Sequence, residues 1–379
     1  PTLRRARRTT TDAEELIDAL RALDPGLLVI DTEAHVAIIA SSRLGVPTAL
    51  TTFWFAIHRR DGVPPLSSSL GPGDGAALTR AWDEVVADAA RVRRRRRWSR
   101  RGIVDRIGPV HYPTTGAPAL RSVARRAGFD LAAETDDRPW LRPHVYTRLP
   151  TLTTNLWELE FDHEPPPNWH YVGPMVHLDR VDTAVASEAR AQLAAFLGGR
   201  GDDRPLVYCS LGSYWAADDS FLTRVVEAFR RRPGYDLVIG LGGRLDPSAL
   251  GPRPGNVLAL AWAPQVEVLG ASRAAIVHGG NAALNECVVQ GVPMVVYSTG
   301  HLDQNGVAAR VRHHGAGVVG SLATDTPDEI ARNVDLVLGD PTIRARVAEL
   351  RALARDPARM AHAVDLLERI AGEPGGGSG

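Results

Sequence analysis

The sequence predicts an α/β protein with two doubly wound domains. Short apolar runs alternate with amphipathic segments, which is the pattern of parallel strands joined by helices. The first such run covers residues 26–30 and ends at Asp31, and T-P-D-E at residues 326–329 predicts a capped helix start with proline at its first position. The chain has 379 residues, 44% of them hydrophobic, and so is long enough to fill two cores of ordinary size.

The N-terminal elements follow the same alternation. Residues 10–23 predict an amphipathic helix capped by Thr10 or Thr11, because apolar side chains recur there at helical spacing behind an acidic first turn. After the first strand, a helix is expected through Ser42 and another strand over residues 46–52.

Composition limits the classes of function. The formal net charge is +0, which argues against nucleic acid as the main partner, because no overall positive field would attract a polyanion. No apolar run is long enough to span a membrane. The two cysteines, Cys209 and Cys287, are expected to be buried thiols in a reducing compartment rather than a disulfide. These features predict a cytoplasmic globular protein.

The stretch from Trp262 to Arg310 carries the clearest chemistry. An apolar strand over residues 275–277 turns through H-G-G into a helix over residues 281–290. A helix N-terminus offers unpaired N–H groups and the positive end of a dipole, which suits a diphosphate. Glu286 lies in that helix and can accept hydrogen bonds from two ribose hydroxyls, while Trp262 offers a flat face for a base.

The order W-A-P-Q, H-G-G-N-A-A-L-N-E and D-Q-N-G-V-A-A-R resembles the nucleotide-sugar signature of family 1 glycosyltransferases. These are two-domain enzymes of the GT-B fold, with two Rossmann-like domains facing a cleft. The resemblance implies that Trp262 stacks on uracil, that His278 and the helix N-terminus hold the diphosphate, and that Asp303 and Gln304 bind the sugar. The whole donor set that it implies is Ser210, Gly212, Ser213, Trp262, Ala263, Gln265, His278, Gly279, Gly280, Asn281, Ala282, Ala283, Glu286, Asp303 and Gln304.

Two departures from the signature concern the phosphates and the sugar. Ala282 and Ala283 stand where many family members carry polar side chains, so contacts to phosphate are expected from backbone N–H groups. The segment between Pro293 and Asp303 is one residue longer than usual, which affects the placement of the sugar hydroxyls.

Asp31 is the predicted catalytic residue. Family members carry an aspartate after an L-V-x-D strand, where it orients a catalytic histidine; alternatively, Asp31 caps the following helix. The family's histidine lies in a Gly-His turn after the first strand, and no histidine precedes Asp31 here. We expect the start of the acceptor domain to be missing and the chain alone to transfer sugar slowly. His35 and His58 are the substitute bases, with His35 expected to face outward and His58 to lie in a loop.

The predicted acceptor wall consists of Phe53, Trp54 and Phe55, in a segment that resembles the acceptor loop of carotenoid glucosyltransferases. Ordinary core packing explains the same aromatic residues equally well.

The charge run from Arg91 to Arg101 also has two interpretations. It is the solvated end of a helix that begins near Ala77, or, together with Trp98, a weak docking site for an anionic membrane surface.

These observations predict an acceptor-binding domain over residues 1–180, a donor-binding domain over 190–355, a returning helix over 356–374 and a linker-like tail over 375–379. The resemblance implies inverting transfer of a hexose, glucose by preference, from a UDP-sugar to a hydroxyl of a small apolar acceptor. It implies no cofactor and no metal, and dTDP remains an alternative to UDP. A nucleotide-sugar-binding remnant without turnover, and an epimerase or phosphorylase of the same architecture, are the other possibilities.

Overall fold

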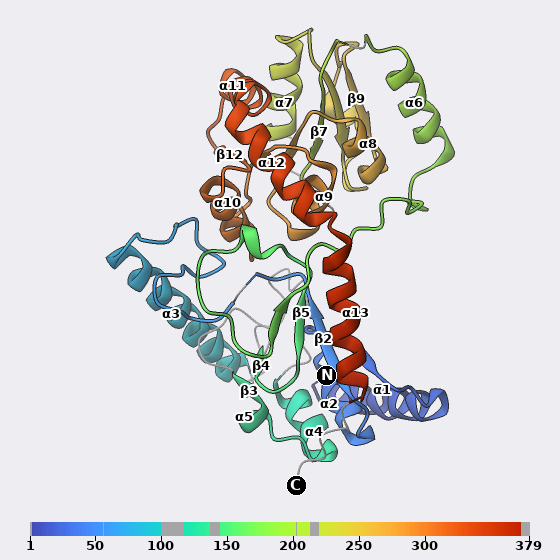
Figure 1. Ribbon diagram of the computed structural model, residues 1–379, viewed down its shortest axis with the longest axis vertical. Coiled ribbons are helices and arrows are strands. Elements are labelled where there is room, and N and C mark those ends of the chain that lie inside the picture. The colour runs from blue at the N-terminus through green and yellow to red at the C-terminus, as the bar shows by residue number, and fades with distance from the viewer. Residues whose placement is uncertain are drawn as a thin grey trace.

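The computed structural model describes residues 2–55, 57–99, 117–136, 145–201, 203–212 and 220–372. Figure 1 shows two α/β lobes, with the N-terminal sheet in the lower lobe and the C-terminal sheet in the upper one. The predicted α/β class, with parallel sheets and alternating helices, is therefore confirmed.

The N-terminal lobe contains a parallel sheet with the order β1-β2-β5-β6. Its strands are β1 (Leu28–Asp31), β2 (Thr48–Thr52), β5 (Thr151–Thr153) and β6 (Trp169–Tyr171). The helices of this lobe are α1 (Thr2–Leu23), α2 (His35–Ser41), α3 (Ala76–Ser99), α4 (Ala117–Ala127) and the single turn α5 (Leu131–Glu134). A short hairpin pairs β3 (Thr135–Asp136) with β4 (Val145–Tyr146).

Helix α1 begins at Thr2, so the predicted cap at Thr10 or Thr11 is wrong. The residues before the threonines are mostly arginine, leucine and alanine, which are strong helix formers, so the helix continues through the weaker threonines. Its apolar face packs against α2 and α4, in a small core that contains Ile17 and Ile39.

The C-terminal lobe contains a six-stranded parallel sheet with the order β12-β11-β10-β7-β8-β9. Read from β9 to β12, this is the strand order of dinucleotide-binding folds, in which the first strand (β7) lies beside the fourth (β10). The strand order reverses between these two strands. The strands are β7 (Leu206–Ser210), β8 (Asp236–Gly240), β9 (Val257–Leu260), β10 (Ala274–Val277), β11 (Met294–Val296) and β12 (Gly317–Val319). Ligands bind such sheets in the crevice at the reversal, outside the carboxyl ends of the strands.

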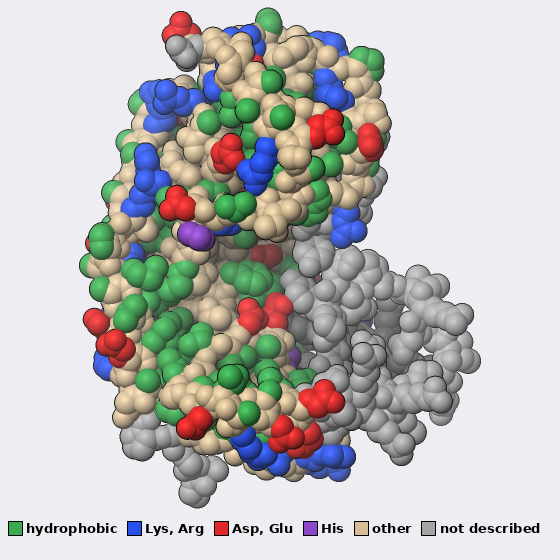
Figure 2. Space-filling model, turned by 90° about the vertical axis from the view of Figure 1, so that its right-hand side faces the viewer, with side chains coloured by type: hydrophobic (Ala, Val, Ile, Leu, Met, Phe, Trp, Pro, Cys, Tyr) green, Lys and Arg blue, Asp and Glu red, His purple; other side chains and the backbone are tan. Residues whose placement is uncertain are grey.

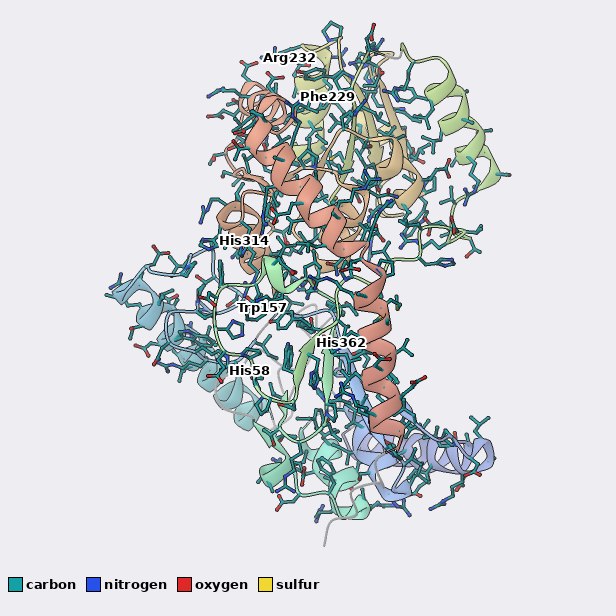
Figure 3. All side chains as sticks on the ribbon, viewed as in Figure 1. His58, Trp157, Phe229, Arg232, His314 and His362 are labelled. Atoms are coloured by element: carbon teal, nitrogen blue, oxygen red, sulfur yellow. The ribbon has the colours of Figure 1, made fainter. Side chains whose placement is uncertain are left out.

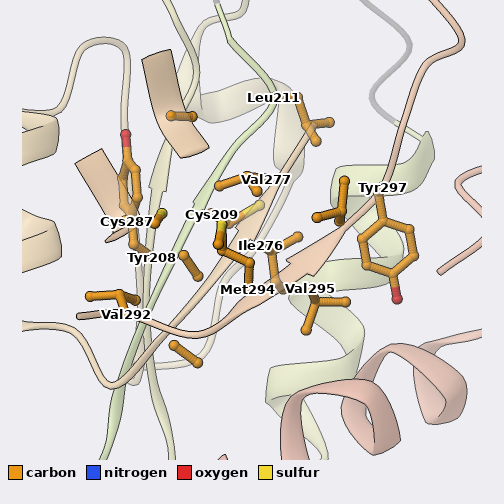
Figure 4. Close-up of a cluster of buried hydrophobic side chains, with 14 of the residues drawn as sticks. Tyr208, Cys209, Leu211, Ile276, Val277, Cys287, Val292, Met294, Val295 and Tyr297 are labelled. Atoms are coloured by element: carbon orange, nitrogen blue, oxygen red, sulfur yellow. The ribbon is translucent and has the colours of Figure 1, made fainter. Parts of the chain in front are cut away.

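Helices cover both faces of this sheet: α6 (Ser187–Gly198), α7 (Ser220–Arg230), α8 (Gln265–Ala271), α9 (Asn281–Gln290), α10 (Gln304–His313), α11 (Pro327–Gly339) and α12 (Pro341–Ala354). Helix α11 starts with the predicted capping box between Thr326 and Glu329. Figure 4 shows the apolar layer between strands and helices, in which Cys209 and Cys287 are buried free thiols, as predicted.

Helix α13 (Pro357–Gly372) leaves the upper lobe and packs along the N-terminal sheet (Figure 1). Its residues Ala363 and Leu366 lie in one buried cluster with Ala49 of β2 and Leu152 of β5. Figure 3 marks this helix by His362.

The two lobes share buried contacts as well as the returning helix. Trp54, Phe55 and Leu66 of the lower lobe belong to the same apolar cluster as the upper sheet. The side chains of Glu160 and Arg310 form an ion pair across this boundary, and both are fully buried. Helix α10 is thereby held against the N-terminal lobe.

Among the residues that the structure describes, no helix is long and apolar enough to cross a membrane. In the charge run from Arg91 to Arg101, the side chains from residue 92 onward lie outside the part that the structure describes. Its proposed membrane contact stays a prediction.

Candidate active site

The candidate site lies at the carboxyl ends of β7 and β10, where the order of the upper sheet reverses. Figure 2 shows a recess at mid-height between the two parts of the molecule, with hydrophobic and acidic side chains on its walls.

Glycines make room for His278 in the turn after β10. A Cβ on Gly212 would lie 2.7 Å from the imidazole Cε1, and one on Gly280 would lie 2.6 Å from Nε2. Gly279 adopts φ +85°, which other residues rarely tolerate. Helix α9 then begins without a side-chain cap, so its first N–H groups are available to a bound anion.

Burial lowers the pKa of His278 to about 4. The imidazole is therefore neutral at pH 7, and its Nδ1 is buried with no hydrogen-bond partner among the described residues. It can offer a hydrogen bond to a phosphate but no charge. The positive end of the α9 dipole must supply the electrostatic attraction.

Glu286 lies in α9 and is about 5% exposed. It accepts hydrogen bonds from the amide of Gln265 and from Arg180, whose Nη1 lies 2.5 Å from Oε1. The hydroxyl of Tyr208 donates to Gln265 Oε1 at 3.1 Å, which orients that amide. Sequence reasoning missed Arg180, because a lone arginine in a linker segment carries no motif.

Trp262 is 41% exposed and its indole lies against Gly243, in the loop after β8. A Cβ on Gly243 would lie 2.5 Å from the indole Nε1, and Gly243 has φ +69°. The glycines after β8 therefore provide the space that the indole occupies.

Asp303 and Gln304 stand at the start of α10, and both are buried. Asn281 donates a hydrogen bond to the Asp303 carboxylate. Gln304 Oε1 accepts from the backbone N–H (3.0 Å) and the hydroxyl (2.7 Å) of Thr299, so its NH₂ group remains a donor. Burial raises the pKa of Asp303 to about 6. A carboxylate and an amide donor side by side suit the hydroxyls of a sugar.

The lower lobe contributes Asp31 and Glu33 from the turn after β1. Asp31 is exposed and accepts a hydrogen bond from the Glu33 backbone N–H at 2.7 Å. Glu33 is half-buried, and burial followed by the negative charge of Asp31 raises its pKa to about 7. The Trp54 indole offsets part of this rise, and the charge of Asp303 adds to it. Sequence reasoning missed Glu33, because glutamate in a turn is common and only its environment distinguishes it.

No group of three His, Cys, Asp or Glu side chains within the described ranges is placed to hold a metal ion.

A family model described as UDP-glucoronosyl and UDP-glucosyl transferase matches residues 121–366, more than half of the chain. The chain belongs to this family. The predicted resemblance to family 1 glycosyltransferases is thereby confirmed.

Two curated relatives of the chain come from bacteria. The oleandomycin glycosyltransferase of Streptomyces antibioticus is 30% identical over 199 residues, which cover 51% of this chain and 46% of the relative. The 4'-demethylrebeccamycin synthase of Lentzea aerocolonigenes is 27% identical over 371 residues, which cover 94% of this chain and 77% of the relative. The match thus spans about half the length of the first relative.

Solved glycosyltransferases have the same fold. The structure of the glycotransferase of kitacinnamycin aligns with a TM-score of 0.65 at 22% identity, over 96% of this chain and 80% of that one. The calicheamicin glycosyltransferase CalG4 aligns with a TM-score of 0.64 at 21% identity, over 98% of this chain and 80% of that one. This family member therefore has the predicted GT-B fold.

The other signature positions of this family member fall into three groups. Ser210 and Gly212 follow β7 at the crevice, and Ser210 Oγ accepts from the Gly212 N–H at 3.4 Å. Ala282 is exposed at the start of α9, whereas Ala283 is buried in the core and Ala263 packs against it. The Ala283 side chain therefore faces the core and not a donor, because it lies on the inner side of α9. Ser213 lies outside the described residues.

The structure contradicts the predicted orientation of His35 and confirms the predicted loop position of His58. His35 does not face outward; it is buried, and its Nδ1 lies 3.0 Å from the Tyr146 hydroxyl, because the first turn of α2 packs onto the hairpin. His58 lies in the loop between β2 and α3, as predicted, and its half-buried ring packs edge-on against Trp169 with 5.0 Å between the ring centroids (Figure 3).

The aromatic triplet divides between core and surface. Phe53 is exposed, whereas Trp54 and Phe55 are buried, with Phe55 lying under the Arg310 guanidinium at 4.7 Å. The core interpretation holds for Trp54 and Phe55, whereas the acceptor role of the exposed Phe53 stays a prediction.

Proposed function

We propose that this family member transfers a hexose, glucose by preference, from a UDP-sugar to a hydroxyl of a small apolar acceptor. The observation that carries the proposal is the convergence of the donor signature on one crevice. His278, Glu286 and the Asp303–Gln304 pair come from three segments and surround the reversal of the sheet order.

Each group then has one task. Trp262 stacks on the base, Glu286 binds the ribose hydroxyls, and the start of α9 with neutral His278 stabilises the departing diphosphate. Asp303 and Gln304 hold the sugar. The acceptor oxygen attacks the anomeric carbon from the face opposite the diphosphate, so the configuration inverts and the nucleoside diphosphate leaves with the bonding electron pair.

A small apolar natural product is the acceptor class we favour. One relative is named for oleandomycin and another for the synthesis of 4'-demethylrebeccamycin, and both compounds are natural products. Phe53 offers an exposed aromatic side chain on the lower lobe.

The proposal is tested by turnover. The chain is incubated with UDP-glucose or dTDP-glucose and a panel of hydroxylated lipophiles, polyketides and flavonoids, and products are detected by mass spectrometry. A glycoside with the anomeric configuration opposite to the donor's, measured by NMR, supports transfer with inversion. Release of a 2-epimeric or phosphorylated sugar without an acceptor favours the epimerase or phosphorylase alternative. Binding of UDP without any product favours the remnant.

We also propose that transfer needs no metal and no cofactor. Dialysis against EDTA should leave the transfer rate unchanged, and a rate that returns only after addition of Mg²⁺ or Mn²⁺ would contradict this.

A further inference from the structure

Glu286 has both of its carboxylate oxygens engaged by side chains of the protein itself. Gln265 Nε2 donates to Oε2, and Arg180 Nη1 lies 2.5 Å from Oε1. The Glu286 side chain is only 6% exposed, because these two donors cover most of what α9 leaves open. A ribose hydroxyl can therefore reach the carboxylate only by displacing one of them.

The two donors are held with different firmness. Gln265 is the first residue of α8, and its Oε1 accepts from the hydroxyl of Tyr208, a residue that is 2% exposed. Arg180 belongs to the linker, residues 172–186, which forms neither helix nor strand. The Arg180 side chain is 35% exposed. Arg180 is thus the donor that a ligand can displace, whereas Gln265 is fixed on both sides.

A second acidic group awaits Arg180 when it leaves Glu286. Its Nε lies 3.3 Å from Asp182 Oδ1 in the same linker. Asp182 is itself held in place, because its backbone oxygen accepts from Arg190 Nη2 at 3.0 Å. The displaced guanidinium keeps a counter-charge and gains water, so its release costs little free energy.

We propose that Arg180 competes with the ribose of the nucleotide for Glu286, and that it thereby sets how tightly the protein holds its donor and its diphosphate product. The inference rests on the assignment of Glu286 to the ribose in the proposed function. In the free protein the guanidinium occupies Oε1. In the complex the ribose hydroxyls replace it, and Arg180 turns towards Asp182 and solvent.

The competition favours turnover, because it stabilises the empty site. A carboxylate as buried as that of Glu286 is costly to leave without a partner. When the nucleoside diphosphate departs after transfer, Arg180 returns from the linker and restores the ion pair. Product release then exchanges one partner of Glu286 for another instead of exposing a bare buried charge.

The first test compares UDP binding to wild type and to Arg180→Met by calorimetry. The dissociation constant should fall by about threefold to tenfold in the variant, because the ribose no longer displaces a partly exposed charged donor. A gain in affinity cannot result from damage to the fold. A dissociation constant equal to or above that of wild type would overturn the proposal.

Arg190→Met is the matched control. Arg190 also fastens the linker, through the Asp182 oxygen and a 3.5 Å contact with Glu267, but it does not contact Glu286. Its replacement should leave the dissociation constant of UDP within twofold of wild type. The same gain in both variants would place the effect in a loosened linker and contradict the competition.

A double-variant comparison tests whether the effect passes through the carboxylate. In a Glu286→Gln background there is no charged acceptor to compete for, so adding Arg180→Met should leave UDP affinity unchanged. A gain there as large as in the wild-type background would refute the mechanism.

Hydrogen exchange of the linker gives an independent readout. Binding of UDP should speed amide exchange in residues 172–186 of wild type, because Arg180 is released, and should produce no such increase in Arg180→Met. Slower exchange on binding would mean that Arg180 closes onto the nucleotide, which overturns the proposal. A wild type that neither binds UDP nor forms a glycoside would refute the proposed function, whereas an active wild type with no affinity gain in Arg180→Met refutes this inference alone.

Discussion

Replacing Arg310 by methionine should destabilise the protein strongly, because it breaks the buried ion pair between the lobes. Arg310 Nε donates to Glu160 Oε1 at 2.8 Å, a second guanidinium nitrogen donates to the same oxygen, and Nη1 donates to the Gly306 oxygen at 3.1 Å. The guanidinium also lies 4.7 Å and 4.4 Å from the ring centroids of Phe55 and Phe161.

The magnitude follows from what the substitution leaves behind. Both side chains are 0% exposed, so Arg310→Met leaves the Glu160 carboxylate buried without its arginine, while the Phe161 N–H (2.8 Å) and the Tyr171 hydroxyl (2.7 Å) still donate to it. Breaking such a pair from one side typically costs ~3 to 5 kcal/mol. Glu160→Gln should cost a similar amount, because it leaves the arginine charge uncompensated.

Urea unfolding at pH 7, followed by tryptophan fluorescence, measures these changes. The double variant Arg310→Met with Glu160→Gln removes both charges, so it should be clearly more stable than the sum of the two single losses predicts. Arg231→Met, which breaks an exposed pair with Glu227, is the control and should cost less than ~1 kcal/mol. A loss below ~1 kcal/mol in Arg310→Met, or strict additivity in the double variant, would refute the reasoning.

Three further predictions concern the donor site. Glu286→Ala should weaken UDP binding by ~1.5 to 3 kcal/mol in calorimetry, because a charged hydrogen-bond acceptor is lost. Glu267→Ala, at an exposed position, is the control and should leave UDP affinity unchanged. If Glu286→Ala binds UDP as tightly as the wild type does, the ribose binds elsewhere. Asp303→Ala and Gln304→Ala should preserve UDP affinity but reduce transfer, and loss of UDP binding in either would contradict their assignment to the sugar. Because burial lowers the pKa of His278 to about 4, the folded protein binds fewer protons than the unfolded chain between pH 4 and about 6.5. The stability that depends on neutral His278 should therefore be complete above pH ~6.5 and should be lost as the pH falls towards about 4. Over this range the free energy of unfolding in urea should fall more for the wild type than for His278→Gln. Equal falls in the two proteins would show that His278 is not responsible.

The sequence by itself determined the local features of this protein. The α/β class follows from the alternation of apolar strands and helices, and the capping box at Thr326 follows from a four-residue pattern. The turn at His278 and the helix that follows it are also local, because neighbouring residues in the chain form them. For the same reason the donor signature could be recognised from order and spacing alone.

Only the tertiary structure decided which distant groups act together. Arg180 and Glu286 lie 106 positions apart in the chain, and Glu160 and Arg310 lie 150 positions apart. No sequence motif relates the two members of either pair, because their contact depends on how the lobes pack together. That packing results from many small contacts summed over the interface. The raised pKa of Glu33, the neutral state of His278 and the burial of Phe55 all arise from that packing. Burial is a property of the folded surroundings and not of the residue, so no local pattern in the sequence could reveal it.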